Sequence, residues 1–450
     1  MPLLGVARLK PREIAVSVLQ AQAHQGRYVE SILESAIAQG DMTQADRHLA
    51  QELVYGVVRW QATLDWLIDR KTAHRTQKYL LQVLLRLGLY QMFWLDRIPA
   101  YAAIHETVEL ARQLGCGPQA GFLNAVLRGF DRERAQTRQL LDDLKRQQPS
   151  LGYSHPDWLC RRWEQAWDPV SLTALLEWNN TPPPTYARRN ALKTDPDRLT
   201  ALWAAEGVAF KPRAWDWTEL GLVFELIAHP SLTQLPSFQQ GLFYLQDPST
   251  LLAVHLLGPQ PGEAILDLCA APGGKTTFIA QCLNNQGRLV ASDVQPARLE
   301  LLRANCARLG VTCVTFQTGP DLAPAGEAFD RVLLDVPCSN TGVLRRRVDL
   351  RWRLQPEESL RLQRVQIGLL ERAAASVKPG GCLVYSTCSL EPEENQGVIG
   401  AFLQTQPGFV LETERALRPF ADQVDGAYVA RLRRTAETPL AEPANHSKTS

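Results

Sequence analysis

The 450-residue sequence lacks the patterns that mark a secreted, membrane-bound or metal-stabilised protein. Its nine cysteines include no C-x-x-C pair, so we predict no zinc site, and without a secretory signal we predict no disulfide framework. The apolar run at the N-terminus is too short for a signal peptide, and no window approaches the roughly 18 uncharged apolar residues of a membrane span. We therefore expect a cytoplasmic protein with reduced thiols, no metal and no membrane partner.

An excess of either charge is also missing. Lysine and arginine number 48 against 47 acidic residues, which gives a net charge of +1. The chain as a whole is therefore not a basic nucleic-acid binder, and any contact with RNA has to come from local patches. The length exceeds that of one ordinary domain, so we expect two or three domains.

Helical periodicity dominates the N-terminal part, from Arg12 to about Asp131. Val29, Ile32 and Leu33 lie on one apolar helix face. The stretch Tyr79–Leu95 is apolar almost all round, which is typical of a helix at the centre of a bundle. We predict an all-α domain over residues 1–141.

The pattern changes over residues 142–236, for which we predict a small α/β module. Short β-like runs at Thr185–Arg189 and Leu222–Leu226 flank a predicted helix at Pro196–Glu206. Tryptophan recurs in this part. Exposed indole rings would suit stacking on bases, although core packing is the commoner fate of tryptophan.

Strands alternate with helices over residues 237–434, which predicts a doubly wound α/β domain with a parallel sheet and helices on both faces. The helices are expected at Gln295–Leu309 and Glu357–Val377. The strands are expected at Ala264–Leu268, Arg288–Ser292, Val311–Phe316, Arg331–Leu334 and Cys382–Ser386, with weaker ones at Phe409–Glu412 and Tyr428–Leu432. Residues 435–450 are rich in Pro, Ala, Glu and Ser, and we predict a disordered tail.

A glycine-rich turn follows the first of these strands, at Cys269–Lys275. A strand, such a turn and then a helix are typical of a nucleotide-cofactor site, because glycine lets the backbone approach the ligand. A Walker A loop would need its first glycine at Cys269, and this mismatch argues against an NTPase. The second strand runs into Asp293, 20 residues after Gly273, where an acidic residue can bind ribose hydroxyls. The alternative for Asp293 is a helix N-cap.

Two cysteines follow neighbouring predicted strands. Asp335 and Cys338 come after one strand and Cys388 after the next. Ligands of open α/β sheets bind outside the carboxyl ends of the strands, so both thiols should face one crevice. A thiolate that adds to carbon 6 of a cytosine makes carbon 5 nucleophilic toward an electrophilic methyl group, and a second thiol could assist release. Asp335 could hold the amine or N3 edge of a base that has left its stack.

With these motifs the chain resembles the bacterial 16S ribosomal RNA cytosine-5 methyltransferases of the ribosomal small subunit methyltransferase B family, within the Nol1/Nop2/Sun group. The cofactor turn, Pro337-Cys338 and Thr387-Cys388 are similar to that family's motifs, and Glu394-Asn395 follows as the family expects. The segment Gly241–Thr250 is similar to the entry into its catalytic domain, and the helical part resembles its NusB-type RNA-binding domain.

The resemblance implies a Rossmann-like class I methyltransferase domain that uses S-adenosylmethionine, with 16S ribosomal RNA as partner and a monomeric chain. It assigns the nucleophile to Cys388 and assistance of release to Cys338, a division that spacing alone leaves open. The implied cofactor contacts are Cys269, Ala270, Ala271, Pro272, Gly273, Gly274, Lys275, Asp293 and Asp335, with Asp321 as the equivalent of an acidic adenine contact.

The chain departs from the family pattern at several positions. Phe278 stands where a histidine is common, and Arg347-Val348-Asp349 replaces a segment that often has His-Pro before the aspartate. An arginine run surrounds this segment, and we interpret it as a phosphate clamp, with a solvated face as the alternative. The run consists of Arg345, Arg346, Arg347, Arg351 and Arg353.

Three other functions stay open at this point. The chain could be an RNA-binding assembly factor with an inactive enzyme domain, although the intact Cys338 and Cys388 argue against this. An NTPase would bind ATP and ignore S-adenosylmethionine. A transfer RNA substrate is possible within the same group, although the NusB-like domain favours ribosomal RNA.

Overall fold

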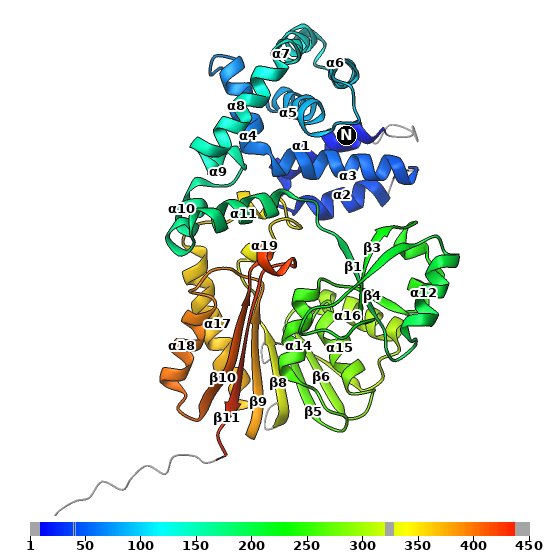
Figure 1. The fold of residues 1–450 in the computed structure, drawn as a ribbon, viewed down its shortest axis with the longest axis vertical. Helices are drawn as coiled ribbons and strands as arrows, with labels where there is room; N and C mark the ends of the chain where they lie inside the picture. Colours follow the sequence, from blue (N-terminus) through cyan, green and yellow to red (C-terminus); the bar gives the residue numbers. More distant parts are fainter. Residues whose placement is uncertain (1–9, 39, 41, 320–327, 437–450) are drawn as a thin grey trace, which may run out of the picture. The chain divides into compact units, whose positions relative to one another are not determined.

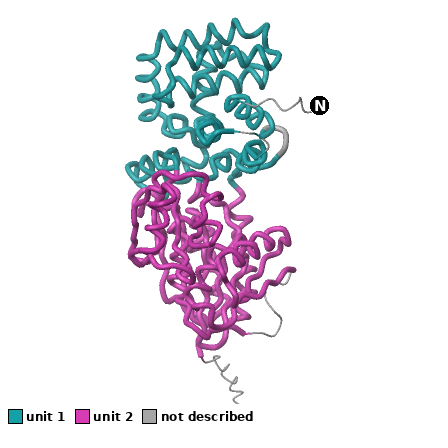
Figure 2. The backbone as a smooth tube through the Cα atoms, turned by 90° about the vertical axis from the view of Figure 1, so that its right-hand side faces the viewer, with its two compact units in different colours: residues 1–182, 344–356 teal, residues 183–343, 357–450 magenta. Residues whose placement is uncertain are grey.

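The computed structural model describes residues 10–38, 40, 42–319 and 328–436. The chain forms two compact units (Figure 2). Unit 1 contains residues 1–182 and 344–356, and unit 2 contains residues 183–343 and 357–450. The boundaries predicted at residues 142 and 237 divide the chain more finely and stay predictions. The predicted tail lies outside the described residues except for residues 435 and 436.

Every element in the described part of unit 1 is a helix, as predicted for residues 1–141. The central helix α5 (Tyr79–Trp94) contacts α1, α3, α4, α6 and α7, because it is buried on most of its circumference (Figure 1). The first helices of unit 1 are α1 (Pro11–Gln25), α2 (Val29–Ala38), α3 (Gln44–Arg59), α4 (Gln61–Lys71), α6 (Ala100–Gln113) and α7 (Ala120–Arg132). They are followed by α8 (Arg134–Gln147), α9 (Pro149–Gly152), α10 (Asp157–Ala166) and α11 (Pro169–Asn180).

Unit 2 begins with a small antiparallel sheet in the order β2-β3-β1-β4. Its strands are β1 (Thr185–Arg189), β2 (Ala209–Arg213), β3 (Val223–Ala228) and β4 (Phe243–Leu245), and α12 (Pro196–Ala205) covers one face. The sequence did not predict β2, which carries Pro212, and the sheet tolerates this proline because β2 is an edge strand. Trp203 of α12 is fully buried among Phe224 and Phe243, so at this position the core interpretation of tryptophan is confirmed.

The large sheet of unit 2 has seven strands in the order β10-β11-β9-β8-β5-β6-β7. The strands β5 to β9 are parallel, as predicted, and β11 runs antiparallel to both of its neighbours. Their bounds are β5 (Ala264–Leu268), β6 (Arg288–Asp293), β7 (Val314–Thr318), β8 (Phe329–Asp335), β9 (Val377–Thr387), β10 (Phe409–Leu417) and β11 (Ala427–Arg434). β7 begins later than predicted because Val311 N–H donates to the Cys306 carbonyl and so closes the preceding helix.

Helices cover both faces of this sheet (Figure 1). Ile265 and Leu333 pack with α14 (Leu251–Leu257), α15 (Gly274–Cys282) and α16 (Pro296–Leu309). Leu266 and Leu334, one residue further along each strand, pack on the opposite face with α17 (Glu358–Ala375) and α18 (Gln396–Thr405). This alternation follows from the period of two in a strand and confirms the doubly wound class.

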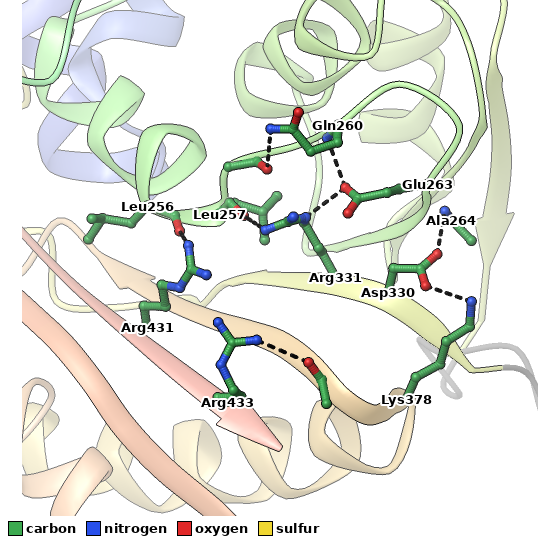
Figure 3. Close-up of polar contacts among 12 residues, drawn as sticks. Leu256, Leu257, Gln260, Glu263, Ala264, Asp330, Arg331, Lys378, Arg431 and Arg433 are labelled. Carbon is green, nitrogen blue, oxygen red and sulfur yellow. Dashed lines mark hydrogen bonds and ion pairs between the residues drawn. The ribbon is translucent and has the colours of Figure 1, made fainter. Parts of the chain in front are cut away.

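The parallel strands of the large sheet define two edges, an amino edge where they begin and a carboxyl edge where they end. At the amino edge, Arg331 donates to the carbonyl of Leu257 and Arg431 to that of Leu256, so both arginines cap the C-terminus of α14 (Figure 3). Lys378 pairs with Asp330 at 2.7 Å. The side chains around a cavity of about 240 Å³ at this edge are therefore used to hold the fold together.

The parts of the chain that the structure describes contain no helix long and apolar enough to cross a bilayer.

Candidate active site

The cofactor turn Cys269–Lys275 joins β5 to α15 at the carboxyl edge. Gly273 has a φ of 104°, and a Cβ added there would lie 2.3 Å from Leu302 Cδ1, so only glycine fits the turn. Ala270 N–H donates to the Ser292 carbonyl of β6 at 3.0 Å. The turn is thus fastened to the neighbouring strand, and its backbone is set before any ligand arrives.

Asp293 ends β6 beside this turn. Its carboxylate is buried and accepts hydrogen bonds from Ala271 N–H at 3.2 Å and Gln295 N–H at 3.0 Å. The second contact lies at the start of α16, so the carboxylate contributes to the helix start as well as to the cofactor turn. Val294, the next residue, leaves 53% of its surface exposed and provides apolar area beside the turn.

Asp335 and Lys275 bring the ends of β8 and the cofactor turn together. Lys275 Nζ lies 2.6 Å from Asp335 Oδ2, and Ser386 Oγ donates to Asp335 Oδ1 at 3.0 Å. Burial acts to lower the pKa of Lys275, but the Asp335 carboxylate outweighs it and raises the pKa. Lys275 is therefore a cation, and the ion pair joins the cofactor turn to the end of β8 at the carboxyl edge.

The two predicted cysteines meet at the same edge. Cys338 Sγ lies 3.3 Å from Cys388 Sγ. The loops that carry them approach closely at Gly342, where an added Cβ would lie 2.8 Å from the Cys388 carbonyl oxygen. The contact with Cys388, together with burial, raises the pKa of Cys338 well above that of an ordinary thiol. Cys338 therefore keeps its proton at neutral pH.

Asn340 contacts both cysteines, and the sequence did not predict it as a site residue. The Cys388 thiol donates to Asn340 Oδ1 at 3.0 Å, and Asn340 Nδ2 donates to the Cys338 carbonyl at 2.6 Å. Its φ of 59° lies in the left-handed region, which asparagine tolerates better than most residues. An asparagine two residues after a strand-end cysteine is the sequence signal that could have indicated it.

Glu394 joins the two loops that carry the cysteines by hydrogen bonds to both. It is fully buried and accepts from Ser339 N–H at 2.9 Å, Ser389 Oγ at 2.8 Å and Gln366 Nε2 at 2.9 Å. Burial raises the pKa of Glu394. Because Ser339 and Ser389 each follow a site cysteine directly, Glu394 fixes the spacing of the two thiols.

The two remaining parts of the predicted site are Asp321 and the arginine run. Asp321 lies outside the described residues. The phosphate clamp is wrong for Arg345 and Arg351, whose side chains are buried, and stays a prediction for Arg346 and Arg347; the segment belongs to unit 1. There Arg351 is fully buried and donates to the Ser154 and Asn179 carbonyls, and Arg353 donates to the Gly26 carbonyl. Apolar residues alternate with these arginines, and this pattern marks a segment that packs into a core. They are Val348, Leu350, Trp352 and Leu354.

Comparison with known protein families identifies the family to which the chain belongs. The model of the 16S rRNA methyltransferase RsmB/F family matches residues 254–433, the NusB family model matches residues 9–132, and a RsmF/B-like ferredoxin-like domain matches residues 155–223. A probable ribosomal RNA small subunit methyltransferase B of Synechocystis sp. is 38% identical over 404 residues, which cover 88% of this chain and 89% of the relative. The chain belongs to the ribosomal RNA small subunit methyltransferase B family.

Other members and solved structures agree with this assignment. The family member of Bacillus subtilis, described as probable, is 36% identical over 91% of this chain and 93% of its own length. A methyltransferase homolog protein from Pyrococcus horikoshii matches 66% of this chain and 99% of its own at 31% identity, with a TM-score of 0.56. The crystal structure of PH0851 covers 96% of this chain and 100% of its own with a TM-score of 0.78, and at 23% identity it supports the fold alone.

Proposed function

We propose that this chain transfers a methyl group from S-adenosylmethionine to carbon 5 of a cytosine in 16S ribosomal RNA, through a covalent bond between Cys388 and carbon 6. The observation that carries the proposal is the pair of thiols 3.3 Å apart at the carboxyl edge, next to the cofactor turn and the Asp335–Lys275 pair. The family relatives are named for methylation of small-subunit ribosomal RNA, and the cysteine chemistry supports cytosine as the base.

The cofactor turn fits S-adenosylmethionine in its chemistry. Small residues at Ala270, Ala271 and Gly273 leave the backbone open to a ligand, and the exposed Val294 offers an apolar surface to an adenine. Asp267 Oδ1, at the end of β5, is buried and has no hydrogen-bond partner among the described residues, which is consistent with a polar group completing the site. When bound, the cofactor would supply the electrophilic methyl group.

Cys388 begins the reaction in this scheme. The Cys388 thiol gives up its proton to solvent and Sγ forms a bond to carbon 6. The electron pair of the carbon 5–carbon 6 double bond then makes carbon 5 nucleophilic toward the methyl carbon, whose bond to the cofactor sulfur would break to leave S-adenosylhomocysteine. Cys338 keeps its proton because the neighbouring Cys388 and burial raise its pKa. A thiol that keeps its proton is a poor nucleophile, which supports Cys388 for that role.

Asp335 orients the base during that step. Its carboxylate is held by Lys275 and Ser386 and would accept a hydrogen bond from the exocyclic amine of the cytosine. After methyl transfer the proton on carbon 5 passes to solvent, its bonding electrons re-form the carbon 5–carbon 6 double bond, and the bond from carbon 6 to Cys388 breaks with its electron pair returning to Sγ, which takes up a proton. Cys338, 3.3 Å away, is the group placed to assist this release.

The test compares three variants on a denaturing gel, each incubated with S-adenosylmethionine and unmodified small-subunit ribosomal RNA. We expect Cys338→Ala to accumulate a covalent protein–RNA band, and we expect none from Cys388→Ala. Cys382→Ala changes a buried cysteine in the middle of β9; it is the matched control and should transfer methyl groups like the wild type.

The reverse pattern of bands would make Cys338 the nucleophile. A wild type that transfers no methyl to the RNA would contradict the proposed activity itself and favour an RNA-binding assembly factor with an inactive enzyme domain.

A further inference from the structure

Arg188 of β1 is a buried cation that none of the proposed chemical steps uses. Its side chain is fully buried, and its guanidinium donates to the Gly274 carbonyl at 2.7 Å and to Thr277 Oγ1 at 2.9 Å. It also donates to Gln246 Oε1. Gly274 is both the first residue of α15 and part of the cofactor turn, so this contact joins the small sheet to the turn.

Burying this charge is costly. No carboxylate among the described residues pairs with Arg188, and burial lowers its pKa to about 10, so it stays protonated at neutral pH. The guanidinium instead lies over the rings of Phe278 at 4.9 Å and Tyr244 at 5.4 Å. Phe278 is one of the positions at which the sequence departs from the family pattern. These acceptors and rings together hold the guanidinium of Arg188 in one orientation.

The small sheet contacts α15 at both ends. Asn190 lies two residues after Arg188, on the same side of the extended chain, and its Oδ1 accepts from Gln281 Nε2 at 3.1 Å. Gly274, Thr277 and Gln281 are spaced i, i+3 and i+7 along α15, which places them on one face of the helix. Arg188 and Asn190 therefore hold the first and last turns of the helix that follows the cofactor turn.

We infer that Arg188 is a positioning residue that sets the cofactor turn for S-adenosylmethionine. The inference rests on the proposed function, because it concerns the affinity of the same site for its cofactor. Loss of the guanidinium frees the Gly274 carbonyl and the first turn of α15. The backbone of Gly273 and Lys275 then no longer has one conformation before the ligand arrives, and the cost appears as weaker cofactor binding.

The first experiment measures the affinity for S-adenosylhomocysteine by isothermal titration calorimetry. Arg188→Met should raise the Kd about tenfold, as expected for the loss of charge-assisted hydrogen bonds. The matched control is Arg189→Met. Arg189 lies on the same strand, but it donates to the carbonyls of Gly221 and Thr194, in the connections between elements of the small sheet and α12, and should change the Kd by less than about twofold.

Kinetics separate positioning from a general structural role. In Arg188→Met we expect a raised KM for S-adenosylmethionine, an unchanged KM for the RNA, and a kcat near the wild-type value at saturating cofactor. Arg188→Lys keeps the charge and should recover part of the affinity. If Arg188→Met does not fold, as judged by circular dichroism, Arg188→Lys and Thr277→Val carry the test, and both should weaken binding.

Folded Arg188 variants that bind S-adenosylhomocysteine as tightly as Arg189→Met would overturn the inference. Equal rises in both KM values would also overturn it, because they would indicate general damage to the enzyme domain. A wild type that binds no S-adenosylhomocysteine would instead contradict the proposed function, and the inference would fall with it.

Discussion

The two edges of the large sheet are built from similar residues and differ in what those residues contact. β8 carries a carboxylate near each end, and each pairs with a lysine: Asp330 with Lys378 at the amino edge and Asp335 with Lys275 at the carboxyl edge. β9 likewise has Cys382, which lines the cavity at the amino edge, and is followed by Cys388 at the carboxyl edge. Residue type alone therefore does not distinguish the two edges.

The partners distinguish them. At the amino edge the arginines donate to helix carbonyls, and Asp330 accepts from Ala264 N–H, so the polar groups complete secondary structure. At the carboxyl edge the polar groups contact one another and the cofactor turn, and the two thiols share a proton donor–acceptor contact. Side chains whose hydrogen bonds complete secondary structure are not free to bind a substrate. The reactive groups therefore lie at the carboxyl edge, where side chains hold one another in place.

The largest expected effect distinguishes Cys382 of β9 from Cys388, which directly follows that strand. Cys388→Ala should lower the rate of methyl transfer by roughly 10⁴-fold or more, because the nucleophile is removed. Cys382→Ala should leave the rate unchanged and lower stability by about 1 kcal/mol, as for a small buried apolar group. Methyl transfer from labelled S-adenosylmethionine and thermal unfolding measure the two effects. Equal rates in the two variants would remove the distinction.

The two carboxylates of β8 give the next effect. Asp335→Asn should lower kcat by roughly 10²-fold, because Lys275 loses its anion and the base loses its acceptor. Asp330→Asn should leave kcat within about twofold. Single-turnover methyl transfer provides the comparison. A comparable loss of kcat from Asp330→Asn would show that the amino edge also serves the reaction.

Removal of Asn340 should have a smaller effect at the carboxyl edge. Asn340→Gly keeps the left-handed backbone but deletes the acceptor of the Cys388 thiol, so kcat should fall by roughly 3–10-fold, the worth of one neutral hydrogen bond. The KM for S-adenosylmethionine should not change, because Asn340 does not contact the cofactor turn. Steady-state kinetics with varied cofactor test this, and a selective rise in that KM would argue against the assigned role.

The smallest expected effect is a pH dependence at the amino edge. Burial acts to raise the pKa of Asp330, but the hydrogen bonds from Lys378 and Ala264 N–H outweigh it and lower the pKa. The stabilisation by this carboxylate is therefore complete above its ordinary pKa and is lost as the pH falls through the lowered value. The pair is half-exposed, so at most about 1 kcal/mol is involved. Thermal unfolding between neutral and acidic pH should show this loss in the wild type, and Asp330→Asn should lack it.

Much of the carboxyl edge could be predicted because its signals are local. A strand, a glycine turn and a helix are consecutive in sequence. A cysteine at a strand end can likewise be recognised from a short stretch of sequence, without knowledge of its neighbours in space. Asp293 shows the limit of such signals: the sequence left ribose contact and helix cap as alternatives, and the carboxylate lies where it contacts both the turn and the start of α16.

The arginine run shows a different limit. Composition indicated an exposed basic patch, but the guanidinium of Arg351 donates to carbonyls of residues 154 and 179, far away in sequence. A count of charges cannot reveal which backbone carbonyls a helix end leaves without partners, and these carbonyls decide whether an arginine is buried.

The sequence by itself determined the helical first unit, the alternation of strands and helices, and the positions of both cysteines, because periodicity and turn chemistry act over a few residues. Only the tertiary structure decided that Asn340 would accept from Cys388, that Arg188 would hold the cofactor turn, and that residues 344–356 would pack into the first unit. These contacts join segments dozens to hundreds of residues apart, and they form only when sheet register and helix packing bring those segments together.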